Sequence, residues 1–305
     1  MRYRRLGKTN LNVSAIGLGT WALGGGYDWG KTSSQTVQET VDAAFDAGIN
    51  LIDTAPIYGD SEELLGCALK GRRQDIFLST KCGLVKNGSW TDHDLRLETI
   101  TAQLENSLRL LRTDYIDIYL IHYLDPKVPW QVTLNTLSKL QTQGKIRHIG
   151  ACNIPPDILE EMARAGVISC VQEELSLLHP QKARRILEIC RAYDLGFMAY
   201  GPLCGGILSG KYQREPNLRR ADARNYFYKC YRGDDFVRAQ TIVRRVQEVA
   251  SQKQALPAQV ALAWVLAQEG VTCALPGARS AMQVQQNAGT CGVQLNAEEI
   301  CSLQR

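Results

Sequence analysis

The chain has 305 residues, of which 45% are hydrophobic and 22% are charged, proportions typical of a globular protein with a sizeable core. This composition excludes collagen-like, disordered and coiled-coil proteins. The formal net charge of +4 is too small to indicate nucleic-acid binding by itself.

The N-terminal segment does not resemble a secretory signal. Four basic residues lie between Met1 and Thr9, and no apolar run follows them. No stretch of about 18 uncharged apolar residues, the minimum for a transmembrane helix, occurs along the chain. We therefore expect a cytoplasmic protein without a membrane span.

The cysteines and histidines show no metal-binding pattern. Ten cysteines are scattered without a C-x-x-C pair, and the four histidines have no regular spacing to Cys or Asp. We therefore expect no metal site. In a reducing cytoplasm most of these cysteines are expected to be small buried hydrophobic residues, including Cys82 and Cys152, which flank candidate site residues.

Short apolar runs alternate with longer amphipathic segments along the whole chain, a pattern typical of repeated strand–helix units. Eight runs rich in Ile, Leu, Val or Tyr are predicted strands: 14–19, 49–54, 75–81, 115–122, 146–152, 168–173, 195–200 and 272–277.

Helices are predicted between these strands. Their ranges are 35–47, 61–70, 94–111, 130–142, 156–165, 181–193, 235–267 with a break at Pro257, and 280–288. Gly48, Gly144 and Gly166 follow three of them where C-terminal caps belong. Before the first strand, the sequence RRLGKTNLNVS places a polar turn between apolar positions, which predicts a short hairpin.

Eight strands alternating with helices predict an α/β fold of the (β/α)8 TIM-barrel class, with the N-terminal hairpin as a cap. No Pro-rich or Ser-rich linker divides the chain, so we expect one domain over residues 1–305. The alternative is an open doubly wound sheet with a small second domain. That fold requires a G-x-G-x-x-G fingerprint after its first strand, and the glycines at 17, 19 and 24 have the wrong spacing.

Three neighbouring predicted strands end in an acid, an amine and an imidazole: Asp53, Lys81 and His122. Each alone has an ordinary explanation as a helix cap, a surface charge or a structural histidine. Together they lie at the carboxyl ends of strands, where barrel active sites are found. Because an unpaired buried charge is costly, we expect Asp53 and Lys81 to pair.

Tyr58 follows Asp53 in the same predicted loop. A phenol titrates near pH ~10, but a neighbouring ammonium favours the phenolate and lowers the pKa, here toward the working range. We expect Tyr58 to protonate a carbonyl oxygen, Asp53 to hold Lys81, and His122 to orient the substrate. Since the sequence shows no serine nucleophile elbow, glycosidase-like pair or metal motif, a nicotinamide is the expected hydride donor.

Seven segments form an ordered series of motifs. They are GLGTWALGG (17–25), DTAPIYGDSEELLG (53–66), STK (79–81), YIDIYLIH (115–122), GKIRHIGACN (144–153), YGPLCGGILSGKY (200–212) and LPGARSAMQVQQN (275–287). From Arg5 to Leu303 the chain resembles the aldo-keto reductase superfamily. It is most similar to the bacterial branch whose cofactor motif reads P-G-A-R.

The resemblance implies a reductase of aldehydes and ketones that uses NADPH and forms NADP+. Its catalytic tetrad would be Asp53, Tyr58, Lys81 and His122. The positions similar to the family's cofactor-binding residues are Thr20, Trp21, Asp53, Cys152, Asn153, Gln172, Tyr200, Gly201, Pro202, Leu203, Lys211, Gly277, Arg279, Gln283, Gln286 and Asn287.

Within this set the resemblance assigns particular roles. Asn153 and Gln172 resemble the partners of the nicotinamide carboxamide, and Tyr200 resembles the ring that stacks on the nicotinamide. The segments 202–211 and 277–287 resemble the pyrophosphate loop and the adenosine 2′-phosphate site. A guanidinium at Arg279 suits a phosphate, because it can bind two oxygens at once.

Three positions depart from the family pattern. Cys152 stands where the family has a serine in G-V-S-N, Leu175 where it has the tyrosine of Q-x-x-Y, and Gln286 where it has the glutamate of E-N. A thiol forms weaker hydrogen bonds than a hydroxyl. The departures leave the tetrad intact and concern nicotinamide anchoring and cofactor preference.

Residues 213–233 form a basic segment with six basic and two acidic residues, interleaved with four aromatic residues after Asn225. Such a mixture suits single-stranded nucleic acid. The segment follows the seventh strand, however, where barrel loops cover phosphate-bearing ligands. We therefore expect a lid over cofactor or substrate and no nucleic-acid partner.

Aromatic residues follow several strand ends and are expected to wall a pocket for a small carbonyl or sugar substrate. The predicted substrate residues are Trp21, Tyr58, Trp90, His122 and Tyr123. For Trp90 and Trp130, ordinary packing is an equal alternative.

Two other functions stay open at this stage. The same tetrad serves the oxidation of an alcohol or sugar with NAD(P)+. The superfamily also contains channel-associated subunits that act mainly by binding, so an NADPH-sensing subunit with little turnover is the second class of hypothesis.

Overall fold

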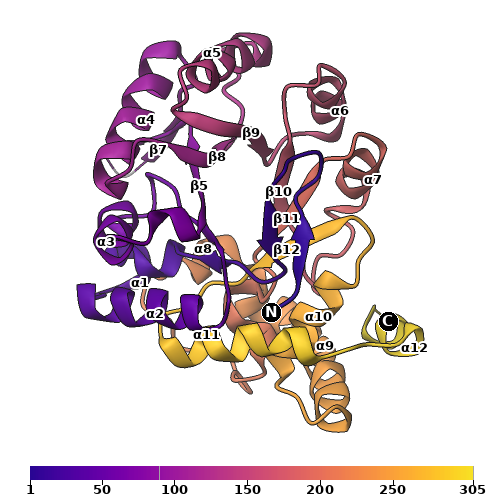
Figure 1. The fold of residues 1–305 in the computed structure, drawn as a ribbon. Helices are drawn as coiled ribbons and strands as arrows, with labels where there is room; N and C mark the ends of the chain where they lie inside the picture. The colour runs from indigo at the N-terminus through magenta and orange to yellow at the C-terminus, as the bar shows by residue number, and fades with distance from the viewer. Residues whose placement is uncertain (89, 305) are drawn as a thin grey trace.

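Eight parallel strands form one sheet in the order β12-β11-β10-β9-β8-β5-β4-β3 in the computed structural model, which describes residues 1–88 and 90–304. The strands are β3 (Leu18–Gly19), β4 (Leu51–Asp53), β5 (Phe77–Cys82), β8 (Ile116–Ile121), β9 (Ile146–Cys152), β10 (Cys170–Glu174), β11 (Gly196–Tyr200) and β12 (Val271–Leu275). Parallel bridges from Ile16 to Ala274 and from Gly19 to Gly277 join the two edges. The sheet is a nearly closed barrel (Figure 1), so the barrel prediction is confirmed and the open-sheet alternative is wrong.

Helices surround the strands (Figure 1). They are α1 (Gly26–Trp29), α2 (Ser34–Asp46), α3 (Ser61–Ala68), α4 (Leu97–Leu111), α5 (Trp130–Thr142), α6 (Pro156–Arg164), α7 (Arg184–Ala192), α8 (Arg224–Phe227), α9 (Gly233–Gln252), α10 (Pro257–Leu266), α11 (Ala281–Ala288) and α12 (Ala297–Gln304). Short 3-10 helices are η1 (Trp21–Leu23), η2 (Arg73–Asp75), η3 (Cys204–Ser209), η4 (Lys229–Tyr231) and η5 (Gly289–Gly292).

The local signals in the sequence explain where several helices begin and end. Gly48, Gly144 and Gly166 have φ values of 74°, 76° and 77°, the left-handed conformation that glycine adopts after a helix. The predicted break in 235–267 is confirmed, because α9 ends at Gln252 and Pro257 is the first residue of α10, a position that proline favours.

The N-terminal hairpin closes the amino end of the barrel, as predicted. Its strands, β1 (Tyr3–Arg5) and β2 (Asn12–Ser14), pair in antiparallel fashion. Three of its apolar residues, Leu6, Leu11 and Val13, join side chains from five barrel strands in one buried cluster. The approach is close, since a Cβ on Gly7 would lie 2.1 Å from the backbone nitrogen of Gly196, the first residue of β11.

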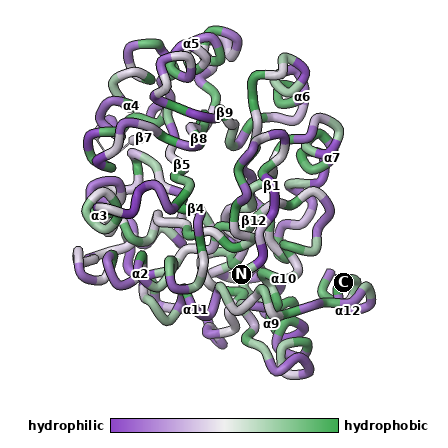
Figure 2. Tube along the Cα trace, in the orientation of Figure 1, coloured by the Kyte–Doolittle hydropathy of each residue, from purple (hydrophilic) through white to green (hydrophobic). Residues whose placement is uncertain are grey.

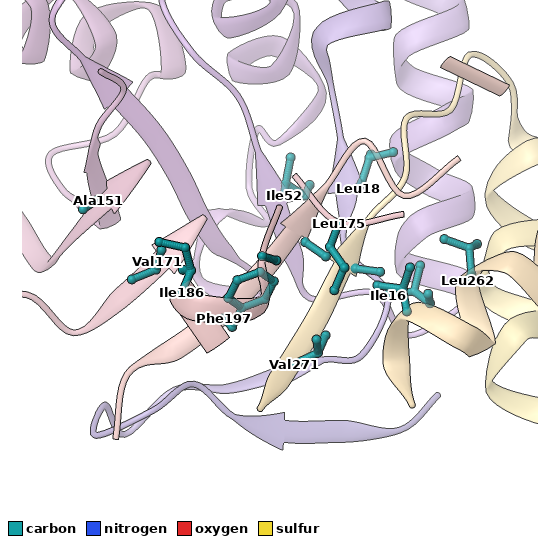
Figure 3. Packing of buried hydrophobic residues seen from close by; sticks show 14 of the residues in the cluster. Ile16, Leu18, Ile52, Ala151, Val171, Leu175, Ile186, Phe197, Leu262 and Val271 are labelled. Atoms are coloured by element: carbon teal, nitrogen blue, oxygen red, sulfur yellow. The ribbon is translucent and has the colours of Figure 1, made fainter. Parts of the chain in front are cut away.

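A second apolar layer lies between the strands and the helices. Val171 of β10, Phe197 of β11 and Ile186 of α7 belong to it (Figure 3). Figure 2 shows apolar and hydrophilic residues alternating along the surrounding helices, as expected of helices that turn one face to the core. Seven of the ten cysteines are buried and all ten are free, as expected for small core residues.

The structure contains elements that the sequence analysis missed. One is the antiparallel hairpin of β6 (Leu84–Asn87) and β7 (Trp90–His93). Its signal was present, because Asn87-Gly88 between strand-like runs is a strong hairpin motif. The helix α12 was also not predicted. Within the described residues, no helix combines the length and apolarity needed to cross a membrane.

The packing of the hairpin predicts that a leucine-to-alanine substitution has very different effects on stability at two positions. Leu6 is fully buried in the barrel, whereas Leu97 is 47% exposed at the start of α4. Leu6→Ala should lower the free energy of unfolding by about 2–5 kcal/mol, because it removes buried methyl groups and leaves a cavity. Leu97→Ala should change it by less than about 0.5 kcal/mol. Urea denaturation measures both, and equal effects would contradict a plug role for the hairpin.

Candidate active site

The parallel strands bring the predicted polar residues to one end of the barrel. Asp53 is the last residue of β4 and Lys81 the last but one of β5, while His122 directly follows β8. The register pairs Asp53 with Ser79 and Lys81 with Leu120. Since all carboxyl ends of parallel strands face one way, these residues meet at the mouth.

Asp53 and Lys81 form a buried ion pair, as predicted. The Lys81 Nζ lies 2.8 Å from Asp53 Oδ2 and donates a second hydrogen bond of 2.8 Å to the Thr54 carbonyl oxygen. The side chains are 1% and 6% exposed. Burial disfavours the ammonium, but the attraction of Asp53 outweighs it, so the pKa of Lys81 lies above its ordinary value.

The second carboxylate oxygen of Asp53 is also occupied. Its Oδ1 accepts hydrogen bonds from Ser79 Oγ at 2.9 Å and from Gln172 Nε2 at 2.8 Å. The sequence analysis did not assign Ser79 a role. Its signal was its position two residues before Lys81, because residues i and i+2 of a strand share a face.

Tyr58 lies beside the ion pair. The Lys81 Nζ is 5.0 Å from the centre of its ring, and the His122 ring meets it edge-on at 6.0 Å. Burial raises the pKa of Tyr58 to about 12, even though Lys81 lowers it. The prediction of a lowered pKa is therefore wrong: loss of solvation outweighs the ammonium, and the phenol is protonated at neutral pH.

His122 is neutral at pH 7. Burial lowers its pKa well below the ordinary value, and the charges of Lys81 and His93 add to this effect. The ring of Tyr123 stacks on it, with 5.4 Å between centroids. A neutral imidazole at the mouth can hydrogen-bond to an uncharged oxygen without adding a second cation beside Lys81.

Asn153 links β9 to β11 at the mouth. It follows Cys152 with a left-handed φ of 54°. Its Nδ2 donates to the His122 carbonyl oxygen at 3.1 Å and contacts the Cys152 sulfur at 3.0 Å, while its Oδ1 accepts from Tyr200 Oη at 2.7 Å. The Cys152 thiol is buried, which raises its pKa well above the ordinary value.

The loop after β3 is fixed to the same strand ends. Thr20 Oγ1 donates to the Asp53 carbonyl oxygen at 2.8 Å and contacts Ser61 Oγ at 2.8 Å. Trp21 in η1 lies 6.0 Å from the Tyr58 ring and 5.3 Å from the Trp29 ring, between centroids. Thr20 and Trp21 are thus at the mouth, as their assignment requires.

The basic segment 213–233 contacts the loop after β3 at the mouth. Phe227 of α8 meets Trp21 edge-on at 4.7 Å between centroids. The backbone nitrogen of Ala223 donates to the Asp28 carbonyl oxygen of α1 at 3.1 Å. This arrangement places the segment across Trp21, the position expected of a lid.

The region around α11 presents a cation and a helix N-terminus. Ser280 caps α11 by accepting from the Gln283 nitrogen, and Gln283 Oε1 accepts from the Arg279 nitrogen at 2.7 Å. Arg279 is exposed. Gly277 forms the bridge to Gly19 of β3, so this region borders the mouth.

The other predicted residues are placed as follows. Gly201, Pro202 and Leu203 follow β11 directly, the Lys211 ammonium lies over the Tyr212 ring, the Gln286 carbonyl oxygen accepts from Gln259, and Asn287 is buried in α11.

Trp90 lies on β7 and is 78% exposed, which rules out ordinary core packing for this side chain. Trp130, in contrast, packs against the main core at the start of α5. The substrate role of Trp90 stays a prediction.

Comparison with known proteins identifies the family. The sequence pattern of the aldo/keto reductase family matches residues 15–305. The chain belongs to this family. Its members are oxidoreductases that act on carbonyl or alcohol substrates with a nicotinamide cofactor.

Relatives cover nearly the full chain. It is 35% identical to aldo-keto reductase YhdN of Bacillus subtilis, over 98% of this chain and 91% of the relative. It is 33% identical to the NADH-specific methylglyoxal reductase of Escherichia coli, over 95% and 94%. The structure of glycerol dehydrogenase AKR11B4 from Gluconobacter oxydans superposes with a TM-score of 0.89 at 32% identity, over 99% and 93%.

The buried ion pair predicts an unusual response to Asp53→Asn. This substitution leaves the Lys81 ammonium buried without its counter-charge, which should cost about 3–5 kcal/mol of unfolding free energy at pH 7. Without Asp53, burial lowers the pKa of Lys81 below its unfolded value of about 10.4. The folded variant then binds fewer protons than the unfolded chain, so its stability should rise between pH 7 and 10.

In the natural chain the pKa of Lys81 is raised instead of lowered. The ion pair's contribution to stability is therefore retained below about pH 10.4 and lost only above it. Asp194→Asn, which breaks the exposed pair with Arg5, is the matched control, with an expected cost below about 1 kcal/mol. Denaturation curves at several pH values test both variants. A stability of Asp53→Asn that falls with pH would contradict the assignment.

Proposed function

We propose that the chain is an NADPH-dependent reductase that converts the carbonyl group of a small aldehyde or ketone into an alcohol. The observation that carries this proposal is the meeting of Tyr58, Lys81 and neutral His122 at one buried point of the mouth. Together these three side chains can bind and protonate a carbonyl oxygen. It offers a proton donor, a fixed positive charge and an uncharged orienting ring.

Tyr58 is the proton donor in this proposal. Its pKa of about 12 keeps the phenol protonated at neutral pH, as a general acid requires. When the phenol gives up its proton, the Lys81 ammonium stabilises the phenolate that forms. Asp53 acts through Lys81 as a positioning residue, and His122 orients the substrate oxygen.

The residues around the mouth fit a nicotinamide dinucleotide, which when bound supplies the hydride. The Arg279 guanidinium is exposed in front of the N-terminus of α11, where a phosphate gains from both the cation and the helix dipole. Gly277 leaves this approach open, because a Cβ there would meet nothing nearer than 3.8 Å. Tyr200 donates to Asn153, which in turn donates to the His122 carbonyl oxygen, so its ring is tied to the strand ends that carry the tetrad.

The pKa of Tyr58 also affects whether the enzyme favours reduction or oxidation. The reverse reaction, oxidation of an alcohol, is the activity named for the similar glycerol dehydrogenase, and it requires Tyr58 as a phenolate base. A pKa of about 12 leaves little phenolate at pH 7. We therefore infer that reduction is favoured near neutrality and that oxidation gains with rising pH.

Tyr58→Phe should reduce carbonyl turnover by at least about 100-fold, because it removes the proton donor, while the affinity for NADPH stays within about twofold. Loss of nicotinamide absorbance with a panel of simple aldehydes measures turnover, and tryptophan fluorescence measures binding. Tyr3→Phe, at the amino end of the barrel, is the matched control and should retain full activity. Turnover that survives in Tyr58→Phe would remove Tyr58 from the mechanism.

Tight NADPH binding by the natural chain without turnover of any carbonyl would favour the binding-subunit hypothesis.

Arg279→Gln should weaken NADPH binding by about 10- to 100-fold, since hydrogen bonds to a charged group contribute about 1.5–3 kcal/mol. NADH has no 2′-phosphate, so its affinity should change by less than about twofold. Arg244→Gln, on the exposed face of α9, serves as the control. Equal weakening for both cofactors would contradict a 2′-phosphate role, and stronger NADH binding by the natural chain would replace NADPH with NADH, the cofactor named for the methylglyoxal reductase.

A further inference from the structure

A second group of chemically reactive side chains lies at the rim of the mouth, apart from the tetrad. Glu174 is the last residue of β10, His179 lies in the loop that follows, and Cys204 begins η3 after β11. One ligand atom of each lies within 4.8 Å of the other two. The proposed reduction uses none of these three side chains.

The hydrogen bonds of Glu174 and His179 hold them in place. Glu174 Oε1 and His179 Nδ1 are 2.8 Å apart, while Glu174 Oε2 binds the Lys182 ammonium. One carboxylate oxygen is therefore fixed by a cation, and the other faces the imidazole. This division leaves Oε1 as a ligand atom whose orientation is already determined.

A buried thiol completes the group. The Cys204 thiol donates a hydrogen bond of 3.0 Å to Ser176 Oγ. The Cys204 carbonyl oxygen accepts from Tyr231 Oη at 3.1 Å, which joins η3 to η4 in the basic segment 213–233. Cys204 is buried. The cluster thus combines a carboxylate, an imidazole and a thiol.

We propose that these three residues, the rim cluster, bind a divalent cation of the Zn²⁺ class. The ligands are Glu174 Oε1, His179 Nδ1 and Cys204 Sγ, and a water molecule takes the fourth position.

The donor set and its spacing suit this class of ion. Carboxylate, imidazole and thiolate are the ligands of Zn²⁺, which takes four in a tetrahedron. Bonds of about 2.0–2.3 Å place tetrahedral ligand atoms about 3–4 Å apart. The three protein ligand atoms already lie within 4.8 Å of one another, so only a small adjustment is required. Lys182 contacts the Glu174 carboxylate and Ser176 the Cys204 thiol, and these contacts orient the two ligands.

Binding exchanges protons for the metal without any redox change. The Cys204 thiol becomes a thiolate and releases one proton to solvent, and the metal's two charges balance this thiolate and the Glu174 carboxylate. Because the metal competes with the proton of the thiol, its affinity should rise with pH.

The sequence could not reveal this site, and the proposal departs from the expectation of no metal site. The ligands come from two separate segments, residues 174–179 and 204, rather than from one spaced motif. Metal binding would therefore tie the loop after β10 to η3.

Titration of the full chain with Co²⁺, with a phosphine reductant to keep the thiols reduced, tests the proposal. One equivalent should produce sulfur-to-cobalt charge-transfer absorption in the near ultraviolet and d–d bands of a tetrahedral site, both abolished by Zn²⁺. Affinity should increase about 10-fold per pH unit, because one proton is released. Cys204→Ser should abolish the charge-transfer band, and His179→Ala should weaken binding at least about tenfold.

Cys67→Ser and Cys301→Ser remove exposed thiols and are the controls, which should keep the full signal. The proposal is overturned if one equivalent of Co²⁺ gives no charge-transfer band or if the band persists in Cys204→Ser. Circular dichroism checks folding, and His179→Ala, in a half-buried loop, supplies the test if Cys204→Ser does not fold.

Discussion

The buried ion pair of Asp53 and Lys81 is the interaction on which the mouth of the barrel depends. An ammonium that is removed from water needs a compensating charge and well-placed acceptors, and Lys81 finds both at the end of β4. Its partner is in turn held by Ser79 of β5 and Gln172 of β10. One buried cation therefore fixes the relative position of the ends of β4, β5 and β10. The phenol of Tyr58 lies beside this ion pair.

Further hydrogen bonds connect these residues to the ends of neighbouring strands. Asn153 turns the backbone with a positive φ and connects the His122 carbonyl oxygen to Tyr200. Cys152, beside it, stands where a hydroxyl is usual in the family, and its sulfur accepts from Asn153. The side chain that orients substrate and the ring expected against the nicotinamide are thus linked through one amide. Polar networks of this kind act as a unit because the local dielectric constant is low.

The features that the sequence predicted are those that depend on local pattern and on topology. The alternation of strands and helices predicts the barrel, and a barrel brings Asp53, Lys81 and His122 together whatever the details of packing. The direction of the Tyr58 pKa was missed, because it depends on how completely the ring is buried, a tertiary property. The hairpin at Asn87-Gly88 was missed despite a local signal. The rim cluster lay beyond any local pattern, since its ligands come from separate segments.

The closure of the barrel joins the two ends of the chain and thereby constrains how the protein folds during synthesis. Leu6 and Leu11 pack with Leu275, so the hairpin cannot be fully buried until β12 has left the ribosome. The hairpin ends at Ser14 and β12 at Leu275, so at about 5–20 residues per second this delay is roughly 13–52 s. During that interval apolar residues of the hairpin face solvent and invite aggregation. Arg5 and Lys8, exposed on either side of Leu6, supply charge that opposes association of nascent chains.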